Sequence, residues 1–383
     1  MAVKLKLRQQ PVPIPGMPGI CGWCRAILFL SLLSAAPLRA AGWSAESRPQ
    51  YDQLFQRTNG WTGADGDFAV SLTNGLTLWL FSDTFVGEVR DGQRTNATMV
   101  NNSAAWQHGV DPAQSHAEFF YGQSQDGKPA ALITPDDGQG WFWLFDAVMA
   151  RGKLFLFLGQ IMRTDNQSVF GFRQTGVWLG EVANPLDPPT HWQVRQRRIP
   201  FAHFRREETL SFGSAVLATN GFVYVYGTRE REGAGKSMIL ARAPETALAN
   251  FSSWEFRAEH GWTTNTAGLA NLCRGLASEY SVSWFPARQD YVLICTKNGL
   301  SDQIVARTAP EPWGPWSAAT VVWRCPEMAW DRQNFCYAAK AHPLLAAGPD
   351  ELIVTYAANS YELAHVVNDA RLYWPRFVRV RWK

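Results

Sequence analysis

Four acidic residues stand in or beside stretches that otherwise read as apolar strands, and they are the residues most able to do chemistry. Asp65 opens the stretch 65–72, Asp146 lies within 141–149, and Glu279 lies within 277–284. Asp83 follows the apolar run Leu78–Phe81. A carboxylate in such a place is costly unless it is paired, hydrogen-bonded or open to a cavity. Their recurrence in separate strands predicts a functional acidic site.

The chemistry that suits this set is the cleavage of a glycosidic bond. That reaction uses two carboxyl groups, one to protonate the departing oxygen and one to attack the anomeric carbon or to activate water. A hairpin formed by the residues after Asp65 would return Asp83 to the side of Asp65. We therefore predict that Asp65, Asp83, Glu279 and Asp146 are the catalytic candidates.

Each acidic residue also has a structural interpretation. Asp65 could be a turn former, and Asp83 could cap a bend through its own backbone. Glu279 could pair with Arg274, and Asp146 could brace the central channel. All four being structural at once is the less favoured interpretation.

Other side chains in the same stretches could bind a sugar. Aromatic faces pack against the C–H surfaces of sugars, although they also fill cores. Trp61 and Trp141 lie next to turns and are the preferred platforms. The remaining candidates offer a polar group or a ring: Asn101, Asn102, Ser214, Tyr280, Tyr337, Lys340, His342, Asn359 and Arg376.

A repeat explains how these residues could meet. Five segments combine a turn signal with alternating apolar positions: 74–81, 151–158, 220–226, 288–295 and 348–356. Each follows another strand-like stretch: 65–72, 141–149, 209–216, 277–284 and 335–342. This pattern is typical of hairpins, and its spacing of roughly 60 to 75 residues suits one four-stranded sheet per repeat.

The repeat predicts an all-β fold, a five-bladed β-propeller. The strand expected at 376–382 would complete a blade with the N-terminal strand. Because propellers bind ligands where their innermost strands converge, the site is expected on the first strand of each repeat.

The N-terminal residues 1–41 have the composition of a secretory signal. Basic residues precede the apolar run 26–36, and Ala40 and Ala41 offer a cleavage site. The run is short for a membrane span, although a membrane anchor or buried helix is the alternative. We therefore predict a secreted or periplasmic protein whose single propeller domain is 42–383.

Composition is consistent with this interpretation. The chain has 383 residues, 46% hydrophobic, with a net charge of +3. Removing residues 1–41 leaves 31 Lys and Arg against 33 Asp and Glu. A mildly acidic protein with 17 Trp outside that segment suits a neutral glycan, and no nucleic-acid partner is expected.

Export would place the cysteines in an oxidising compartment, where disulfides form. Two of the six cysteines fall in the signal segment, so their C-x-x-C spacing is interpreted as accidental. The other four are disulfide candidates with three possible pairings: Cys273, Cys295, Cys325 and Cys336.

The chain resembles secreted bacterial five-bladed propellers of the arabinanase-like and fructosidase-like glycoside hydrolases. The resemblance is closest to the endo-D-arabinanase group, glycoside hydrolase family 183, and its uncharacterised relatives. The segments that carry it span nearly the whole chain after residue 41: 61–67, 78–87, 99–103, 212–216, 278–282, 312–316 and 375–380.

The resemblance implies roles for the acidic residues. Asp65 would be the nucleophile or base, Asp83 or Glu279 the acid, and Asp146 would tune the charge of the site. Arabinanase-like propellers take a catalytic Glu from the third blade, where this chain has Ser214, so the acid stays open. Such propellers can also hold calcium in the channel, but the sequence offers no ligand set, and no cofactor is predicted.

The predicted function is a monomeric, secreted glycoside hydrolase acting on a polysaccharide or oligosaccharide, arabinan-like or otherwise rich in furanosides. No stable membrane insertion is expected. The alternative is a non-catalytic carbohydrate-binding or cell-surface propeller. A sialidase is disfavoured because repeated Ser-x-Asp-x-Gly-x-Thr-Trp boxes are absent.

Overall fold

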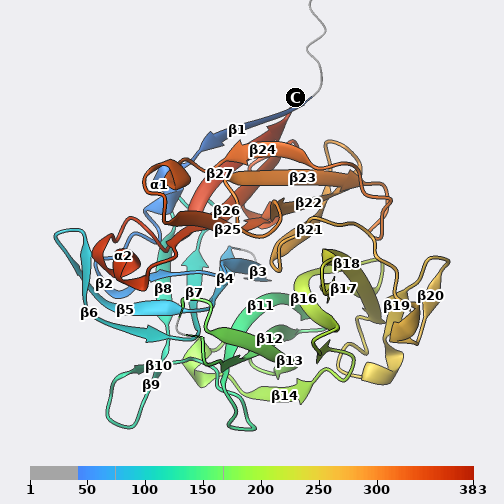
Figure 1. Ribbon diagram of the computed structural model, residues 1–383, viewed down its shortest axis with the longest axis horizontal. Helices are drawn as coiled ribbons and strands as arrows, with labels where there is room; N and C mark the ends of the chain where they lie inside the picture. Colours follow the sequence, from blue (N-terminus) through green and yellow to red (C-terminus); the bar gives the residue numbers. More distant parts are fainter. Residues whose placement is uncertain (1–41, 74, 167) are drawn as a thin grey trace, which may run out of the picture. The chain divides into compact units, whose positions relative to one another are not determined.

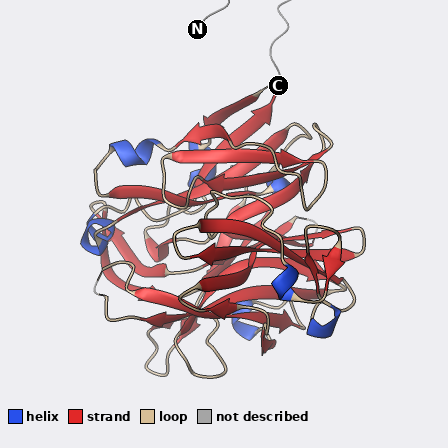
Figure 2. Ribbon diagram, turned by 45° about the vertical axis from the view of Figure 1, so that its right-hand side comes forward, coloured by secondary structure: helices blue, strands red, loops and turns tan. Residues whose placement is uncertain are grey.

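Antiparallel strands and short connections make up nearly all of the computed structural model, which describes residues 42–73, 75–166 and 168–383 (Figures 1 and 2). The predicted signal segment 1–41, with Cys21 and Cys24, lies outside the described residues. The α-helices of the described residues are short: α1 (Pro49–Asp52) and α2 (Leu363–Asn368). In the described part of the chain, no helix has the length and apolar character needed to cross a membrane.

Five sheets of four or more strands follow one another along the described chain. The first contains β3 (Phe68–Thr73), β4 (Leu76–Phe81), β7 (Ser103–His108) and β8 (His116–Phe120). The second contains β11 (Trp141–Ala150), β12 (Lys153–Arg163), β13 (Phe172–Val182) and β14 (Val194–Arg198). The third contains β15 (His203–Phe204), β16 (Glu208–Thr219), β17 (Phe222–Arg231), β18 (Gly235–Pro244), β19 (Glu255–Arg257) and β20 (Trp262–Thr263).

The remaining strands form two large sheets and two small ones. The fourth sheet contains β21 (Tyr280–Phe285), β22 (Asp290–Thr296), β23 (Gln303–Ala309) and β24 (Thr320–Arg324). The fifth contains β25 (Asn334–Ala341), β26 (Glu351–Ser360), β27 (Arg376–Trp382) and β1 (Trp43–Ser47). The small sheets are β2 (Asn59–Ala64) with β5 (Thr84–Arg90) and β6 (Gln93–Val100), and β9 (Gly122–Gln123) with β10 (Pro129–Ala130).

The turns form where the sequence predicts them. Arg151 and Gly152 join β11 to β12, and Asn220 and Gly221 join β16 to β17, all four with positive φ between 52° and 78°. Two consecutive left-handed residues make the tight turn whose twist matches that of the flanking strands. The expected pairing of the two terminal strands is also confirmed, since β1 pairs with β27 from Trp43 opposite Trp382 onward.

The first strands of the five sheets lie toward the middle of Figure 1. β3 contacts β11, which contacts β16, which contacts β21, which contacts β25. The last of them also reaches the first sheet, because the Lys340 ammonium of β25 lies 4.3 Å from the centre of the Phe68 ring in β3. The prediction that the first strands face one another is therefore confirmed.

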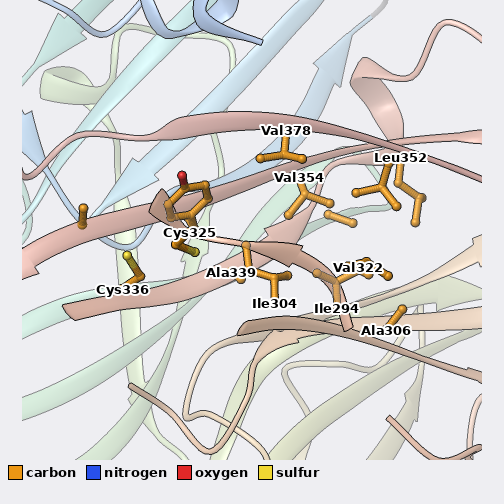
Figure 3. Close-up of a cluster of buried hydrophobic side chains, with 14 of the residues drawn as sticks. Ile294, Ile304, Ala306, Val322, Cys325, Cys336, Ala339, Leu352, Val354 and Val378 are labelled. Atoms are coloured by element: carbon orange, nitrogen blue, oxygen red, sulfur yellow. The ribbon is translucent and has the colours of Figure 1, made fainter. Parts of the chain in front are cut away.

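Apolar side chains fill the space between neighbouring sheets, as Figure 3 shows for the fourth and fifth. Ile294 and Ile304 belong to the fourth sheet and share one buried cluster with Leu352 and Val354 of the fifth. Each such buried side chain stabilises the fold by about 1.5–3 kcal/mol. Sheet-to-sheet packing therefore holds the first strands in place.

The expectation of disulfides is wrong for this structure, in which the four described cysteines are free thiols: Cys273, Cys295, Cys325 and Cys336. Cys325 and Cys336 lie in the cluster of Figure 3 and behave as small apolar side chains. Burial raises the pKa of Cys295 to about 12, which keeps that sulfur protonated and unreactive.

Candidate active site

Irregularities at matching places in the strands shape the site. The pairing of β11 with β12 shifts between Leu144 and Ala147, and that of β25 with β26 shifts between Tyr337 and Lys340. β16 carries the same two-residue irregularity after Phe212. Because bulges redirect side chains and are frequent beside active sites, these positions are where functional groups are expected.

Between the first sheet and the small sheet of β2, β5 and β6, the chain breaks outright at three places. β2 gives way to β3 at residues 65–67, β4 to β5 at 82–83, and β6 to β7 at 101–102. The Asp65 N–H donates to the Asp83 carbonyl at 3.3 Å, and the Ser82 N–H donates to the Asp65 carbonyl at 2.9 Å. The prediction that a hairpin returns Asp83 to the side of Asp65 is confirmed.

Gly66 makes this close approach possible. Its φ is +93°, and a Cβ there would come within 2.9 Å of the Ser82 nitrogen. Any other residue would therefore push the loop that carries Asp65 away from the strand end that carries Asp83.

Two phenol groups hold the Asp65 carboxyl. Tyr337 donates to Oδ2 at 2.6 Å and Tyr373 donates to the same oxygen at 3.0 Å. Oδ1 is buried and has no hydrogen-bond partner among the described residues. Burial raises the pKa of Asp65 well above its usual range, and the nearby charges of Asp83 and Glu279 raise it further.

Two N–H groups hold the Asp83 carboxyl. The Trp143 indole donates to Oδ1 at 3.0 Å, and the Asn101 amide donates to the same oxygen at 3.1 Å. Burial raises the pKa of Asp83 to about 6, while these two donors act in the opposite direction because they stabilise the ionised form. Asp65 and Asp83 together are called the carboxyl pair below.

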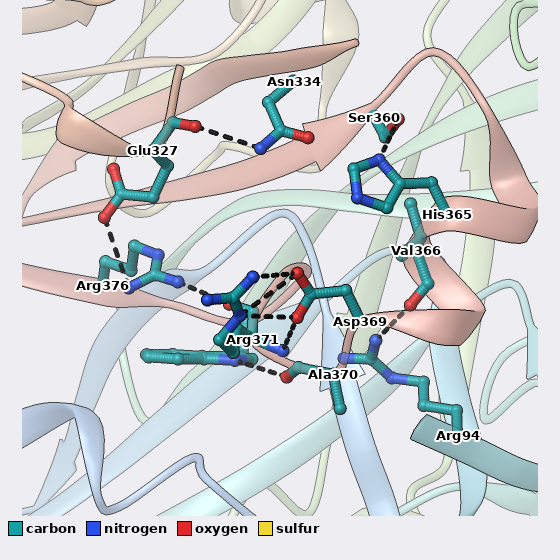
Figure 4. Close-up of polar contacts among 11 residues, drawn as sticks. Arg94, Glu327, Asn334, Ser360, His365, Val366, Asp369, Ala370, Arg371 and Arg376 are labelled. Carbon is teal, nitrogen blue, oxygen red and sulfur yellow. Dashed lines mark hydrogen bonds and ion pairs between the residues drawn. The ribbon is translucent and has the colours of Figure 1, made fainter. Parts of the chain in front are cut away.

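Arg94 fixes the segment that presents Tyr373. Its guanidinium donates to the Val366 carbonyl at 2.7 Å, as Figure 4 shows. It also donates to the Leu372 carbonyl at 2.7 Å, and it is itself buried. A Cβ on Gly63 would lie 2.2 Å from the Tyr373 carbonyl oxygen, so glycine lets this segment approach β2. The phenol of Tyr373 reaches Asp65 from this anchored position.

A second group of charges surrounds Lys340, and we call it the Lys340 cluster: Lys340, Glu279, Asp67 and Asp146. The Lys340 ammonium donates to Glu279 Oε1 at 3.2 Å and to the Ala338 carbonyl at 2.7 Å. Asp67 is fully buried, and neither of its carboxyl oxygens has a partner among the described residues. Burial raises the pKa of Asp67 to about 8, although the Lys340 charge lowers it.

Asp146 braces two sheets. Oδ1 accepts the backbone N–H of Ala147 at 2.8 Å, and Oδ2 accepts that of Val216 in the third sheet at 2.6 Å. Burial raises the pKa of Asp146 to about 7, and the two N–H donors lower it. Both oxygens are thus engaged by backbone, which favours the bracing interpretation over a catalytic one.

The acids of the site are opposed by hydrogen-bond donors and by an ammonium. No three His, Cys, Asp or Glu side chains in the described part of the chain are grouped as metal ligands. The Lys340 ammonium already supplies positive charge to its cluster, and N–H and O–H donors already engage Asp65, Asp83 and Asp146. The donor set of these residues therefore differs from the oxygen cage that calcium requires.

Several of the predicted binding residues do reach the carboxyl pair. Asn101 and Tyr337 touch it directly, and the Asn359 amide donates to the Tyr337 hydroxyl at 3.2 Å. Lys340 reaches Glu279, whose charge acts on Asp65.

Trp141, the other preferred platform, is half-buried and packs against Arg163, whose guanidinium carbon lies 6.0 Å from the ring centre.

Other predicted binding residues belong to the core, and their assignment as ligands is corrected. Trp61 is 1% exposed and donates to Ser103, so it is no platform. Tyr280 is buried, and its hydroxyl donates to the Gly227 carbonyl and interacts with Ser214, which is buried as well. Tyr280 therefore fills space between the third and fourth sheets.

Three more predicted ligands have structural partners. The Asn102 amide is buried and bonds the backbone of Ile133 and Phe142. His342 is buried against Thr355, and burial lowers its pKa to about 3, so it stays neutral. Arg376 forms an ion pair with Glu327 at 3.3 Å, as Figure 4 shows.

Two residues at the carboxyl pair were not among the predicted ligands, namely Trp143 and Tyr373. The signal for Trp143 was its place three residues before Asp146 in the same strand. Tyr373 has φ of +68°, a strained backbone that local sequence does not reveal.

Comparison with known families places the chain. Residues 48–382 match the family described as Domain of unknown function (DUF5005). The chain belongs to this family. No curated protein matches the chain. The family carries no assigned activity, so the narrower resemblance to endo-D-arabinanases stays a prediction.

Several solved structures are similar to the chain over most of its length, and the first of them shares its fold. A protein from Bacteroides ovatus, provisionally named a hydrolase, is similar with a TM-score of 0.72 and 20% identity over 90% of this chain and 93% of its own. The RS223 β-xylosidase has a TM-score of 0.49 and 12% identity, covering 88% of this chain and 94% of its own. The catalytic domain of a Coprinopsis cinerea GH62 α-L-arabinofuranosidase has a TM-score of 0.47 and 11% identity, covering 88% of this chain and 96% of its own.

Proposed function

We propose that the chain is a glycoside hydrolase built on a single five-bladed β-propeller domain, residues 42–383, with the carboxyl pair as its catalytic machinery. The observation that carries the proposal is the juxtaposition of Asp65 and Asp83, each held by its own set of donors. Two neighbouring carboxyl groups with raised pKa values are the equipment that glycosidic cleavage needs.

The kinds of donor and the pKa shifts together support a place for the proton within the pair. Indole and amide N–H groups only donate, so Asp83 Oδ1 accepts twice and the carboxylate is stabilised in its ionised form. Asp65 has the more strongly raised pKa, and its Oδ1 is free to carry a proton. At neutral pH the pair then holds one proton, on Asp65, because two adjacent buried carboxylates resist ionising together.

This assignment gives each residue a role. Asp65 donates its proton to the departing glycosidic oxygen while the bond from that oxygen to the anomeric carbon breaks. Asp83 either attacks the anomeric carbon or takes a proton from the water that does so. This assignment of roles is the reverse of the one that the resemblance to arabinanase-like enzymes implies, in which Asp65 would be the nucleophile or base.

The substrate we propose is a neutral polysaccharide, arabinan-like or otherwise rich in furanosides, met outside the cytoplasm. Support comes from the sequence segments that resemble arabinanase-like enzymes, from the signal-like composition of residues 1–41, and from the fold shared with a provisionally named hydrolase. A monomer suffices, since the carboxyl pair and its donors all come from one chain.

The experiment is a reducing-end assay on a panel of arabinan, xylan and galactan. The variants are Asp65→Asn, Asp83→Asn and, as a matched control, Asp126→Asn on an exposed turn. We expect the wild type and the control to release sugar and both pair variants to lose about 10²–10⁴-fold in rate. Full activity in both pair variants would refute the proposal.

One observation favours a second candidate, a carbohydrate-binding propeller without catalysis. Asp65 Oδ1 is shielded from solvent as well as unpartnered. In the same panel, binding of a glycan by the wild type without any release of sugar would favour this candidate.

A further inference from the structure

A continuous line of aromatic rings connects the two members of the carboxyl pair. We call it the aromatic arc, and its members are Trp143, Phe172, Phe170, Tyr361, Phe335 and Tyr337. At one end Trp143 donates to Asp83, and at the other Tyr337 donates to Asp65. The arc therefore borders the pair on both sides.

The rings of the arc touch in sequence. Trp143 meets Phe172 edge-on with centroids 4.5 Å apart, and Phe172 lies 6.4 Å from Phe170. Phe170 lies 6.0 Å from Phe335 and 6.1 Å from Tyr361. Distances and tilts of this kind are ordinary for packed aromatic rings, so the rings of the arc form one continuous cluster.

The arc joins two sheets that are far apart in sequence. Trp143 and Phe172 belong to β11 and β13 of the second sheet, and Phe335 and Tyr337 belong to β25 of the fifth. Phe170 precedes β13 and supplies the contact between the two halves. The arc thus spans the first sheet's strand breaks, where the carboxyl pair lies.

The middle of the arc is exposed. Phe170 is 41% exposed and Tyr361 is 44% exposed, whereas Phe335 beneath them is 3% exposed. Two further rings connect Phe170 to the carboxyl pair, Phe172 and Trp143, and two connect Tyr361 to it, Phe335 and Tyr337. Exposed aromatic faces linked in this way to a reactive group are characteristic of a ligand site, because their exposure gains nothing for folding.

We propose that the exposed faces of Phe170 and Tyr361 bind a sugar unit of the substrate beside the bond that the carboxyl pair cleaves. This inference rests on the proposed function and adds where the glycan chain lies. Aromatic faces stack on the C–H face of a sugar. The rings carry no charge, so they recognise a neutral glycan rather than a polyanion.

The test is binding to debranched arabinan, measured by affinity electrophoresis in the Asp83→Asn background so that cleavage does not interfere. Phe170→Ala and Tyr361→Ala are compared with Trp284→Ala, which removes a ring of similar exposure, 39%, in the fourth sheet. We expect each arc variant to weaken binding about two- to tenfold and the Trp284 variant to bind normally. Xylan and galactan are run in parallel.

The outcomes separate the two proposals. Unchanged binding in both arc variants overturns the arc, whatever the reducing-end assay shows. Weakened binding in the arc variants supports it even if the wild type cleaves nothing, in which case only the hydrolase proposal fails. Equal losses in all three variants, or no binding of any of the three glycans, also overturn the arc. Circular dichroism spectra like that of the parent exclude misfolding as the cause of a loss.

Discussion

The carboxyl pair and the Lys340 cluster are both buried groups of acids, and they differ in what opposes their charge. The hydrogen-bond donors of the pair are all neutral, two phenols on Asp65 and an indole and an amide on Asp83. Arg163 acts on Asp83 through its charge, which lowers the pKa of that carboxyl without a hydrogen bond to it. The cluster has a buried ammonium, Lys340, bonded to Glu279. The cluster keeps a cation bonded to one of its acids, whereas the pair is arranged to keep one proton available.

This difference predicts opposite costs of mutation. Removing a member of the pair should cost activity and relieve the buried charge. Removing Lys340 should cost stability, because it leaves acids without their cation. The predictions below run from the largest expected effect to the smallest.

Asp83→Asn is expected to lower the rate of glycan hydrolysis by about 10²–10⁴-fold. At pH 8 it is expected to raise the melting temperature, because the pKa of Asp83 is raised to about 6 and its charge then opposes folding. Rates and thermal unfolding of the same preparation check both. A variant that stayed active, or that melted well below the wild type, would place Asp83 with the structural acids.

Lys340→Met is expected to lower the free energy of unfolding by about 3–5 kcal/mol, since it leaves Glu279 without its buried partner. Urea unfolding measures this. Lys128→Met is the control, because both members of its ion pair with Asp126 are exposed and little change is expected there. Equal stability of the two variants would show that the cluster does not depend on its cation.

Tyr337→Phe removes one of the two phenols on Asp65, a bond of 2.6 Å. Losing a donor to the carboxylate raises the pKa of Asp65 further, so the alkaline limb of the pH–rate profile should move to higher pH. The maximal rate should fall by about tenfold, in keeping with one hydrogen bond to a charged group. An unmoved limb would remove Asp65 from the role of acid.

Asp67→Asn should flatten the pH dependence of stability. The pKa of Asp67 is raised from 3.8 to about 8, so the folded chain keeps a proton that the unfolded chain releases. Stability from this group is therefore full below about pH 4 and falls as the pH rises toward 8. The variant should melt a few degrees above the wild type at pH 9 and equally at pH 4. Equal melting temperatures at both values would contradict this.

Sequence patterns predicted the strands and the meeting of Asp65 with Asp83. Turn residues and alternation mark β12 and β17 plainly, and a hairpin necessarily brings its two ends together. The pairing of β1 with β27 followed from the need to complete the last sheet.

The fate of individual side chains was harder to predict. Alternation predicts which face of a strand a side chain occupies, but it does not predict how deeply that side chain is buried. The buried Trp61 and Tyr280 therefore looked like candidate sugar-binding residues. The bulge beside Asp146 redirects that side chain onto the backbone of the next sheet, a contact between residues far apart in sequence. Tyr373 depends on the anchor at Arg94, which is remote in sequence as well.

The most direct test of the carboxyl pair compares Asp65→Asn with Asp83→Asn on two substrates of different leaving group. A 4-nitrophenyl arabinofuranoside needs little protonation of its leaving oxygen, whereas arabinan needs full protonation. If Asp65 is the acid and Asp83 the base or nucleophile, Asp65→Asn keeps substantial activity on the nitrophenyl substrate and loses it on arabinan, while Asp83→Asn loses both. Retention of nitrophenyl activity by Asp83→Asn and its loss by Asp65→Asn would contradict the account.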